Sequence, residues 1–215
     1  MLNETFSVIF KHCVSLSNSL ISAFSRLRHL KKLNLDSNNI TEIKAFAFKG
    51  LSDMTEISLQ NNPIRTLSSF AFSGIRNVSN LMLGHNQLSV IEGSAFAATE
   101  MIQMLILNNN PIKTVESQAF TGLKLVKFIF LPAGVRHLRA DAFSGLEMVD
   151  KLKLAYLDLS ELAPFTFRGI KRLRSLTIEN SDLATIRSNA FAGKYIAMSK
   201  VRFCSYHSVR KSLYF

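Results

Sequence analysis

Several residue types are scarce in this chain of 215 residues, and each scarcity removes a class of protein. There is no tryptophan, and the two cysteines are too few for a small domain stabilised mainly by disulfides. Nine glycines and four prolines exclude a collagen-like or linker sequence. No stretch approaches 18 consecutive apolar residues, so no transmembrane helix is predicted. Apolar residues make up 47% of the chain, which is too much for a disordered protein.

Acidic residues are also few. Asp and Glu total 15 against 26 Lys and Arg, which gives a net charge of +11 and an isoelectric point near 9.9. Such a charge favours polyanionic partners or surfaces without naming one. The aromatic residues are almost all phenylalanine, with 17 Phe against four Tyr, and many of these phenylalanines recur at a regular interval.

A repeat of 24 residues, once shortened to 23, organises the sequence. The segment Leu30–Ile40 aligns with Met54–Ile64, and further copies begin at Val78, Ile102, Val126, Val149 and Leu173. Each copy is followed by a phenylalanine, at positions 24, 48, 72, 96, 120, 143, 167 and 191 when the looser first copy is included. We therefore predict one solenoid domain over residues 1–215, with a degenerate first repeat over about 5–29, seven full repeats over 30–197 and an incomplete last repeat over 198–215.

The spacing within a repeat predicts how it folds. Leu33 and Leu35 are two residues apart, so a strand sends both side chains to one face, and Phe48 closes the back of the coil. One repeat cannot bury its apolar residues alone, but stacked repeats bury them as a continuous core. An asparagine follows the strand at positions 38, 62, 86 and 110, where its amide can satisfy interior backbone groups. Later repeats have Gly134, Leu157 and Ser181 there and need other partners.

The pattern LxxLxLxxNxIxxIxxxAFxGL resembles the typical class of leucine-rich repeat, and the resemblance runs from about Thr5 to Phe203. Proteins of this class are mainly secreted or on the cell surface, such as Toll-like receptors, Slit-type guidance proteins and hormone-receptor ectodomains. The resemblance implies an α/β solenoid shaped like a horseshoe. Its concave face would be a parallel β-sheet, and its convex side mostly irregular or short-helical.

The ends of the chain depart from that class. No signal peptide and no cysteine-clustered cap is visible, so the sequence is interpreted as a fragment or isoform of an extracellular or cell-surface protein, with the full-length protein membrane-anchored or secreted. A cytosolic scaffold is the alternative. Cys13 and Cys204 lie eight repeats apart, roughly 38 Å at ~4.8 Å per strand. A disulfide requires Cα atoms within about 7 Å, so none is expected within the chain.

No set of residues predicts catalysis. The five histidines fall in different repeats, and Cys204 with His207 offers two metal ligands where a structural zinc site takes four. Phosphate-binding and nucleophile-elbow motifs are missing from the sequence. The chain is therefore predicted not to be an enzyme and to hold no cofactor or metal.

The residues that flank the strand leucines are predicted to face the concave surface, and in the middle of the chain they are apolar: Met82, Met104, Ile106, Phe128 and Phe130. Tyr156 lies one strand further on, and three lysines rim the group: Lys127, Lys151 and Lys153. Large exposed apolar patches usually mark interaction sites. We therefore predict recognition of a protein ligand or co-receptor, with a homodimer as a second interpretation.

Other partners follow from the charge. Anionic glycans are an alternative, as for a heparan-binding matrix protein, and Arg26, Arg28, His29, Lys31 and Lys32 form a second basic cluster. Nucleic acid is not expected, because the concave face lacks basic and aromatic residues interleaved along its whole length. Asn3, Asn39 and Asn77 begin glycosylation sequons, a number that chance gives in a chain this rich in Asn, Ser and Thr.

Overall fold

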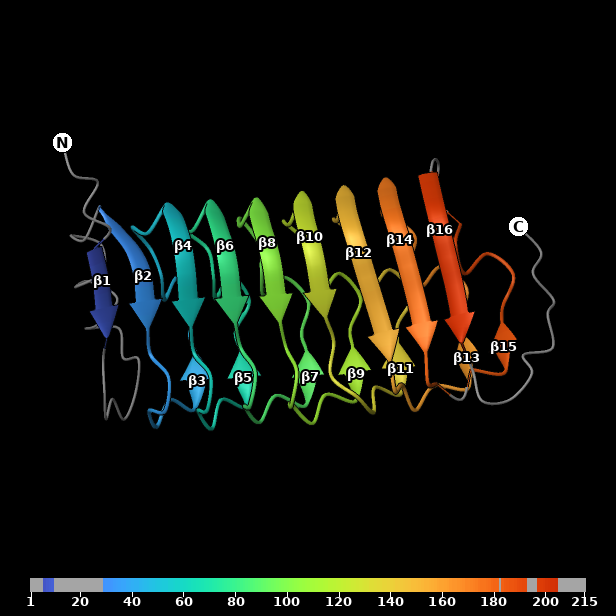
Figure 1. Ribbon diagram of the computed structural model, residues 1–215, viewed down its shortest axis with the longest axis horizontal. Coiled ribbons are helices and arrows are strands. Elements are labelled where there is room, and N and C mark those ends of the chain that lie inside the picture. Colours follow the sequence, from blue (N-terminus) through green and yellow to red (C-terminus); the bar gives the residue numbers. More distant parts are fainter. Residues whose placement is uncertain (1–5, 10–28, 182, 193–196, 205–215) are drawn as a thin grey trace.

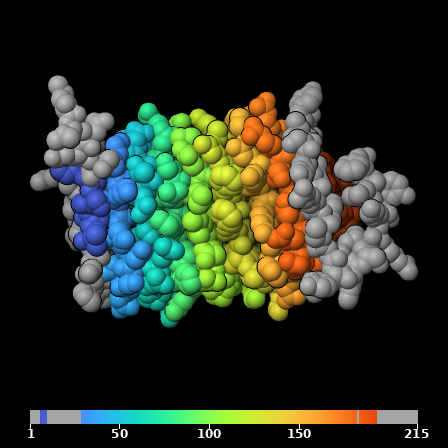
Figure 2. All heavy atoms as spheres, viewed as in Figure 1, coloured from blue at the N-terminus to red at the C-terminus, as the bar shows by residue number. Residues whose placement is uncertain are grey.

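The computed structural model describes residues 6–9, 29–181 and 183–192, and the backbone of 197–204. Its main element is a parallel sheet of nine strands that pair in chain order, one per repeat (Figure 1). These strands are β1 (Phe6–Ile9), β2 (Leu30–Asn34), β4 (Asp53–Ser58), β6 (Asn77–Met82), β8 (Met101–Ile106), β10 (Leu125–Phe130), β12 (Met148–Ala155), β14 (Arg172–Glu179) and β16 (Ala197–Cys204). In a space-filling view the described repeats form adjacent bands in chain order (Figure 2).

Short strands of two residues follow the turns that leave the large sheet. They are β3 (Glu42–Ile43), β5 (Thr66–Leu67), β7 (Val90–Ile91), β9 (Thr114–Val115), β11 (His137–Leu138), β13 (Glu161–Leu162) and β15 (Thr185–Ile186). They pair in parallel as β3–β5, β7–β9–β11 and β13–β15. The chain therefore coils as a β-solenoid whose described turns repeat the same path.

The expectation of an α/β fold with short helices on the convex side is wrong. No helix occurs in the described residues, and the segments opposite the large sheet are successive turns. Phe46 (φ 60°) and Gly50 (φ 100°) both have left-handed backbone conformations, so a right-handed helix cannot continue through either. Left-handed residues at positions equivalent to Phe46 recur in each later described repeat, through Asn189.

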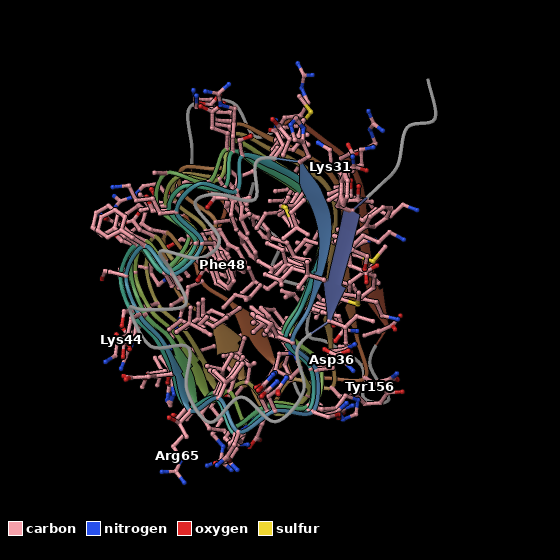
Figure 3. All side chains as sticks on the ribbon, turned by 90° about the vertical axis from the view of Figure 1, so that its left-hand side faces the viewer. Lys31, Asp36, Lys44, Phe48, Arg65 and Tyr156 are labelled. Atoms are coloured by element: carbon pink, nitrogen blue, oxygen red, sulfur yellow. The ribbon has the colours of Figure 1, made fainter. Side chains whose placement is uncertain are left out.

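The phenylalanines of the repeats form a stack in the core. Phe48, Phe72, Phe96, Phe120, Phe143 and Phe167 are fully buried, and the ring centroids of neighbours are 5.3–5.9 Å apart. Figure 3, viewed along the solenoid, places Phe48 in the interior and Lys44 on the side away from the large sheet. The predicted position of this phenylalanine spine is confirmed.

The asparagine ladder is also confirmed. The Asn62 side-chain amide donates to the carbonyls of Leu35 and Leu59 at 2.9 and 3.0 Å, and its oxygen accepts from the Ile40 amide at 3.2 Å. Asn86 and Asn110 make the same contacts one and two repeats later. Each amide thus joins consecutive repeats while it satisfies interior backbone groups.

In later repeats other residues replace the ladder asparagine and make different hydrogen bonds. Gly134 adopts the left-handed conformation (φ 78°) of the shortened repeat, and its amide donates to the Tyr156 carbonyl at 2.7 Å. The Ser181 hydroxyl accepts from the Leu157 amide and donates to the Glu179 carbonyl, both at 3.0 Å. These contacts keep the strands in register although the asparagine is gone.

Candidate binding surface on the large sheet

Two rows of side chains run across the strands on the outer face of the large sheet, here called the sheet face, which is the face that the sequence predicted as concave. Strand register places Met104 beside Phe128 and Phe128 beside Lys151 in the first row. The second row runs Met82, Ile106, Phe130, Lys153, Thr177. The register through the shortened repeat is therefore the one that the sequence predicted.

The five apolar residues of these rows face outward, and we call them the apolar patch: Met82, Met104, Ile106, Phe128 and Phe130. Phe130 is 37% exposed and the other four are half-buried. Their strand neighbours Leu105 and Ile129 point the other way and are at most 1% exposed. Alternation along the strand separates the patch from the core, so its side chains are available at the surface.

The aromatic end of the patch is held in place by its neighbours. The rings of Phe128 and Phe130 stack with centroids 6.3 Å apart and planes 20° from parallel. The Lys151 ammonium lies 5.3 Å from the Phe128 ring centroid, within the range of a cation–π contact. Because the two phenylalanines belong to one central strand, a ligand would meet side chains that are already ordered.

The lysines of the rim differ in their partners. Lys153 forms an ion pair with Glu179 of the next strand. The Lys127 ammonium donates to the side-chain oxygen of Gln103 at 3.3 Å. Lys151 contacts the Phe128 ring, and no carboxylate of the described residues lies within ion-pair distance of it. All three lysines thus lie beside the patch. They differ in the contact that a ligand would have to replace: an ion pair for Lys153, a hydrogen bond for Lys127 and a ring contact for Lys151.

Tyr156 does not belong to the rows. It follows β12 in the turn, has a left-handed backbone (φ 55°) and is 61% exposed. Figure 3 places it at the carboxyl ends of the strands, on the same edge as Asp36. The expectation that it continues the patch one strand further on is therefore corrected: it lies at the edge of the sheet face.

The amino-terminal side of the patch is closed by a polar network that the sequence analysis missed. An Asp36 carboxylate oxygen accepts from the Ser58 hydroxyl at 2.6 Å and from the Gln60 amide at 2.7 Å. Ser58 is 1% exposed, although it stands in the row that holds Met82. Asp36 and Gln60 occupy equivalent places in consecutive repeats, and Ser58 lies two residues before Gln60, but strand register is needed to join them.

A second exposed aromatic pair lies away from the sheet face. Phe46 and Phe70 are 47% and 43% exposed, and their rings stack at 5.9 Å with planes 11° apart. Both occupy the left-handed position of the turns opposite the sheet. The sequence does not reveal this pair, because phenylalanine at this place occurs in only some repeats, whereas the buried phenylalanine two residues later recurs in each.

Carboxyl groups with shifted pKa values lie outside the patch. A hydrogen bond from Asn77 lowers the pKa of Asp53, which begins β4. The Arg168 guanidinium donates to Asp141 in a turn and lowers the pKa of that carboxyl. In the described part of the chain, no group of three or more His, Cys, Asp or Glu side chains is arranged to hold a metal ion.

The predicted glycosylation sites, the second basic cluster and the two cysteines lie away from the apolar patch or outside the described residues. Asn39 is exposed, whereas the Asn77 amide donates to Asp53 at 2.6 Å. Of the second basic cluster, the Lys31 ammonium donates to the Asp53 carbonyl at 2.9 Å. Asn3, Cys13, Arg26, Arg28 and the Cys204 side chain lie outside the described residues. No helix in the described segments has the length and apolar character needed to span a membrane.

Two comparisons with known proteins support the repeat architecture described above. The solved TLR13–ssRNA13 complex aligns with a TM-score of 0.60 and 18% identity, over 92% of this chain and 32% of that one. At this identity the likeness concerns the fold, and the chain spans 32% of that neighbour's length. A search of curated proteins gave no match. The model of the BspA type leucine-rich repeat region, six copies long, matches residues 20–150 and 89–214. The chain therefore belongs to the BspA-type leucine-rich repeat family.

Proposed function

We propose that this chain is a non-enzymatic recognition module that binds a protein partner through the apolar patch of the sheet face. The observation that carries the proposal is the alignment of five outward apolar side chains across β6, β8 and β10. A solvated sheet face is expected to alternate apolar inside with polar outside. Flanking strands follow that rule with Ser175 and Thr177 on one side and Asn34 on the other, so the patch is a local exception.

The patch has the features of a binding hot spot. Phe128 and Phe130 are large, rigid and placed at its aromatic end, and lysines stand beside them. Hot-spot side chains typically cost about 2 kcal/mol or more when truncated, because they fill desolvated contacts at the centre of an interface. Loss of both anchors should therefore weaken binding by at least about 30-fold.

The module is proposed to act outside the cell, as the repeat region of a receptor or adhesion-type protein, secreted or membrane-anchored. Support comes from the resemblance to the typical, mainly extracellular leucine-rich repeat class. The exposed sequon at Asn39 fits a glycoprotein, since its side chain is accessible in the described structure.

The test uses two matched double variants. Phe128→Ser with Phe130→Ser removes the sheet anchors, and Phe46→Ser with Phe70→Ser removes a more exposed aromatic pair on the other side of the solenoid. Surface and secreted proteins are captured on the wild-type chain and on each variant, and each captured protein is then purified and titrated by calorimetry. A partner that binds the wild type and the second variant but not the first supports the proposal. Partners unaffected by the first variant refute it.

Single-stranded RNA is a second candidate, although nucleic acid was not expected from the sequence. Two observations favour it: the stacked Phe128 and Phe130 rings lie beside Lys151 and Lys153 of the next strand, and the similar fold of TLR13 was solved with ssRNA13. Bases stack on aromatic side chains, and lysines neutralise phosphates. RNA affinity should fall steeply with salt, by a slope of about 0.7 per phosphate contacted. A heparan-type glycan should share that salt dependence but tolerate the loss of Phe128 and Phe130.

A further inference from the structure

The apolar patch ends abruptly at one strand boundary, and positive charge begins there. Phe128 and Phe130 on β10 pair in register with Lys151 and Lys153 on β12. The next strand continues the same rows with the hydroxyl residues Ser175 and Thr177. On the other side the first row passes to Asn80 and Glu56 and reaches a lysine, Lys32, only three strands from Met104, while the second row passes to Ser58 and Asn34. The face is therefore polarised across the strands, apolar in the middle and cationic on the β12 side.

Part of this positive charge lacks an internal counter-charge. Lys153 is paired with Glu179, and Arg174 lies 3.5 Å from Asp150. Lys151 pairs in register with Ser175 and, among the described residues, has no carboxylate within ion-pair distance. Its contact is the Phe128 ring, which keeps the ammonium at the junction of the two surfaces. A ligand that covers the phenylalanines would bring its own groups against this ammonium, and a carboxylate there would be favoured by electrostatic complementarity.

We propose, on the basis of the function proposed above, that the partner presents an extended segment with apolar side chains followed by a carboxylate. The segment lies across the strands, with its apolar groups on β6–β10 and its carboxylate at Lys151 and Lys153. From Met82 to Lys153 the row crosses three strand spacings, about 14 Å at ~4.8 Å each. An extended chain advances about 3.4 Å per residue, so this span corresponds to about four residues. The segment therefore carries apolar residues at i and i+2 and Asp or Glu at i+4.

The spacing follows from alternation in the ligand as well as in the sheet. Side chains at i, i+2 and i+4 of an extended segment point to the same side, so all three meet the sheet face. A carboxylate at i+4 reaches the β12 row while the apolar residue at i lies near Met82 and that at i+2 lies between Ile106 and Phe130. The hydroxyls of Ser175 and Thr177, one strand beyond, offer further donors at the same end.

The experiment uses fluorescein-labelled synthetic peptides and fluorescence anisotropy. The core sequence is Leu-Ser-Phe-Ser-Glu between Gly-Ser flanks, with matched peptides in which the Glu becomes Gln or Lys, or in which Leu and Phe become Ser. The wild-type chain should bind the Glu peptide at least about 10-fold more tightly than the Lys peptide. It should bind the peptide without Leu and Phe most weakly, because the apolar contact is then lost.

Reversing the charge of Lys151 and Lys153 tests whether these two lysines bind the carboxylate of the peptide. Lys151→Glu with Lys153→Glu should reverse the preference, so that the Lys peptide binds more tightly than the Glu peptide. The control is Lys124→Glu with Lys171→Glu, which changes the net charge equally. Those two lysines pair with Glu100 and Glu147 and precede their strands, away from the patch. The control variant should keep the wild-type preference, and circular dichroism checks that both variants are folded.

The outcomes separate this inference from the proposed function. Equal binding of the Glu and Lys peptides, or a preference that survives the β12 swap, overturns the carboxylate claim, while dependence on Leu and Phe would leave the patch as a binding site. Binding that ignores the Phe128 and Phe130 double variant refutes the patch itself. Tighter binding of a uridine 12-mer than of the Glu peptide assigns the lysines to nucleic acid and overturns the inference. A dimer by ultracentrifugation that dissociates in the same variant assigns the patch to a second copy and overturns it too.

Discussion

Replacement of Phe96 by Ala tests how the solenoid is held together. The Phe96 side chain is fully buried, and its ring lies 5.3 Å from Phe72 and 5.9 Å from Phe120. Truncation of a buried phenylalanine costs about 3–5 kcal/mol, which includes the cavity that is left. Each stacked aromatic neighbour contributes about 0.5–1.5 kcal/mol. With full burial and two such neighbours, Phe96→Ala should lie well inside this range, at about 4 kcal/mol.

Phe191 provides the comparison, because it is half-buried and stacks on Phe167 at 4.9 Å at the end of the described spine. Partial burial and one stacking neighbour should reduce the cost of Phe191→Ala to about half, ~2 kcal/mol. The assay is urea unfolding followed by circular dichroism, together with amide hydrogen exchange by mass spectrometry. Repeats interact with nearest neighbours, so exchange should rise mainly between β6 and β10 in the Phe96 variant. A loss below about 1 kcal/mol, or equal losses for both variants, would refute the spine as the source of stability.

Further perturbations address the ladder, a surface ion pair and the patch. Asn86→Ala removes the amide that donates to the carbonyls of Leu59 and Leu83 and the oxygen that accepts from the Ile64 amide. The free energy of unfolding should therefore fall by at least about 2 kcal/mol, and a smaller loss would mean that the ladder is dispensable. The hydrogen bond from Arg168 lowers the pKa of Asp141, so its contribution is present above pH 3.8 and is lost as pH falls through the lower folded-state pKa. The stability difference between the wild type and Asp141→Asn should therefore shrink in acid, and a difference that grows would reverse the assignment. Phe128→Ser with Phe130→Ser should leave the urea midpoint nearly unchanged, because both side chains face solvent, and an unfolded variant would show that they belong to the core.

Much of the fold was predictable because its determinants are periodic. Alternation at Leu33 and Leu35 indicates a strand, and the recurring phenylalanine and asparagine each have one physical role per repeat. The shortened repeat was placed correctly, because the residue is lost after the strand and Gly134 absorbs the change in the turn.

The helices were predicted wrongly because the relevant backbone signal is hidden. Glycine at position 50 is a readable sign of a left-handed residue, but Phe46 adopts φ 60° with a bulky side chain, which is uncommon outside glycine, Asn and Asp. Its amide donates to the Phe70 carbonyl of the next repeat at 2.9 Å. That inter-repeat bond fixes the turn, and no local propensity reveals it.

Part of the candidate binding surface was also predictable from the sequence, and part was not. The patch residues followed from strand alternation, since a residue between two core leucines must face outward. Tyr156 was misplaced because the turn begins right after β12, where alternation no longer applies. The Lys153–Glu179 pair and the Asp36–Ser58 bond join side chains of different repeats, so both depend on register that only the structure supplies.

If the apolar patch recognises the partner, its loss should abolish binding that the loss of other exposed aromatic surface leaves intact. Calorimetry distinguishes the two by titrating the Glu peptide into the wild type, the Phe128 and Phe130 double serine variant, and the Phe46 and Phe70 double serine variant. We expect equal affinity for the wild type and the Phe46 and Phe70 variant, with at least about 30-fold weaker binding to the Phe128 and Phe130 variant. Equal affinity for all three proteins, or a larger loss in the Phe46 and Phe70 variant, would contradict it.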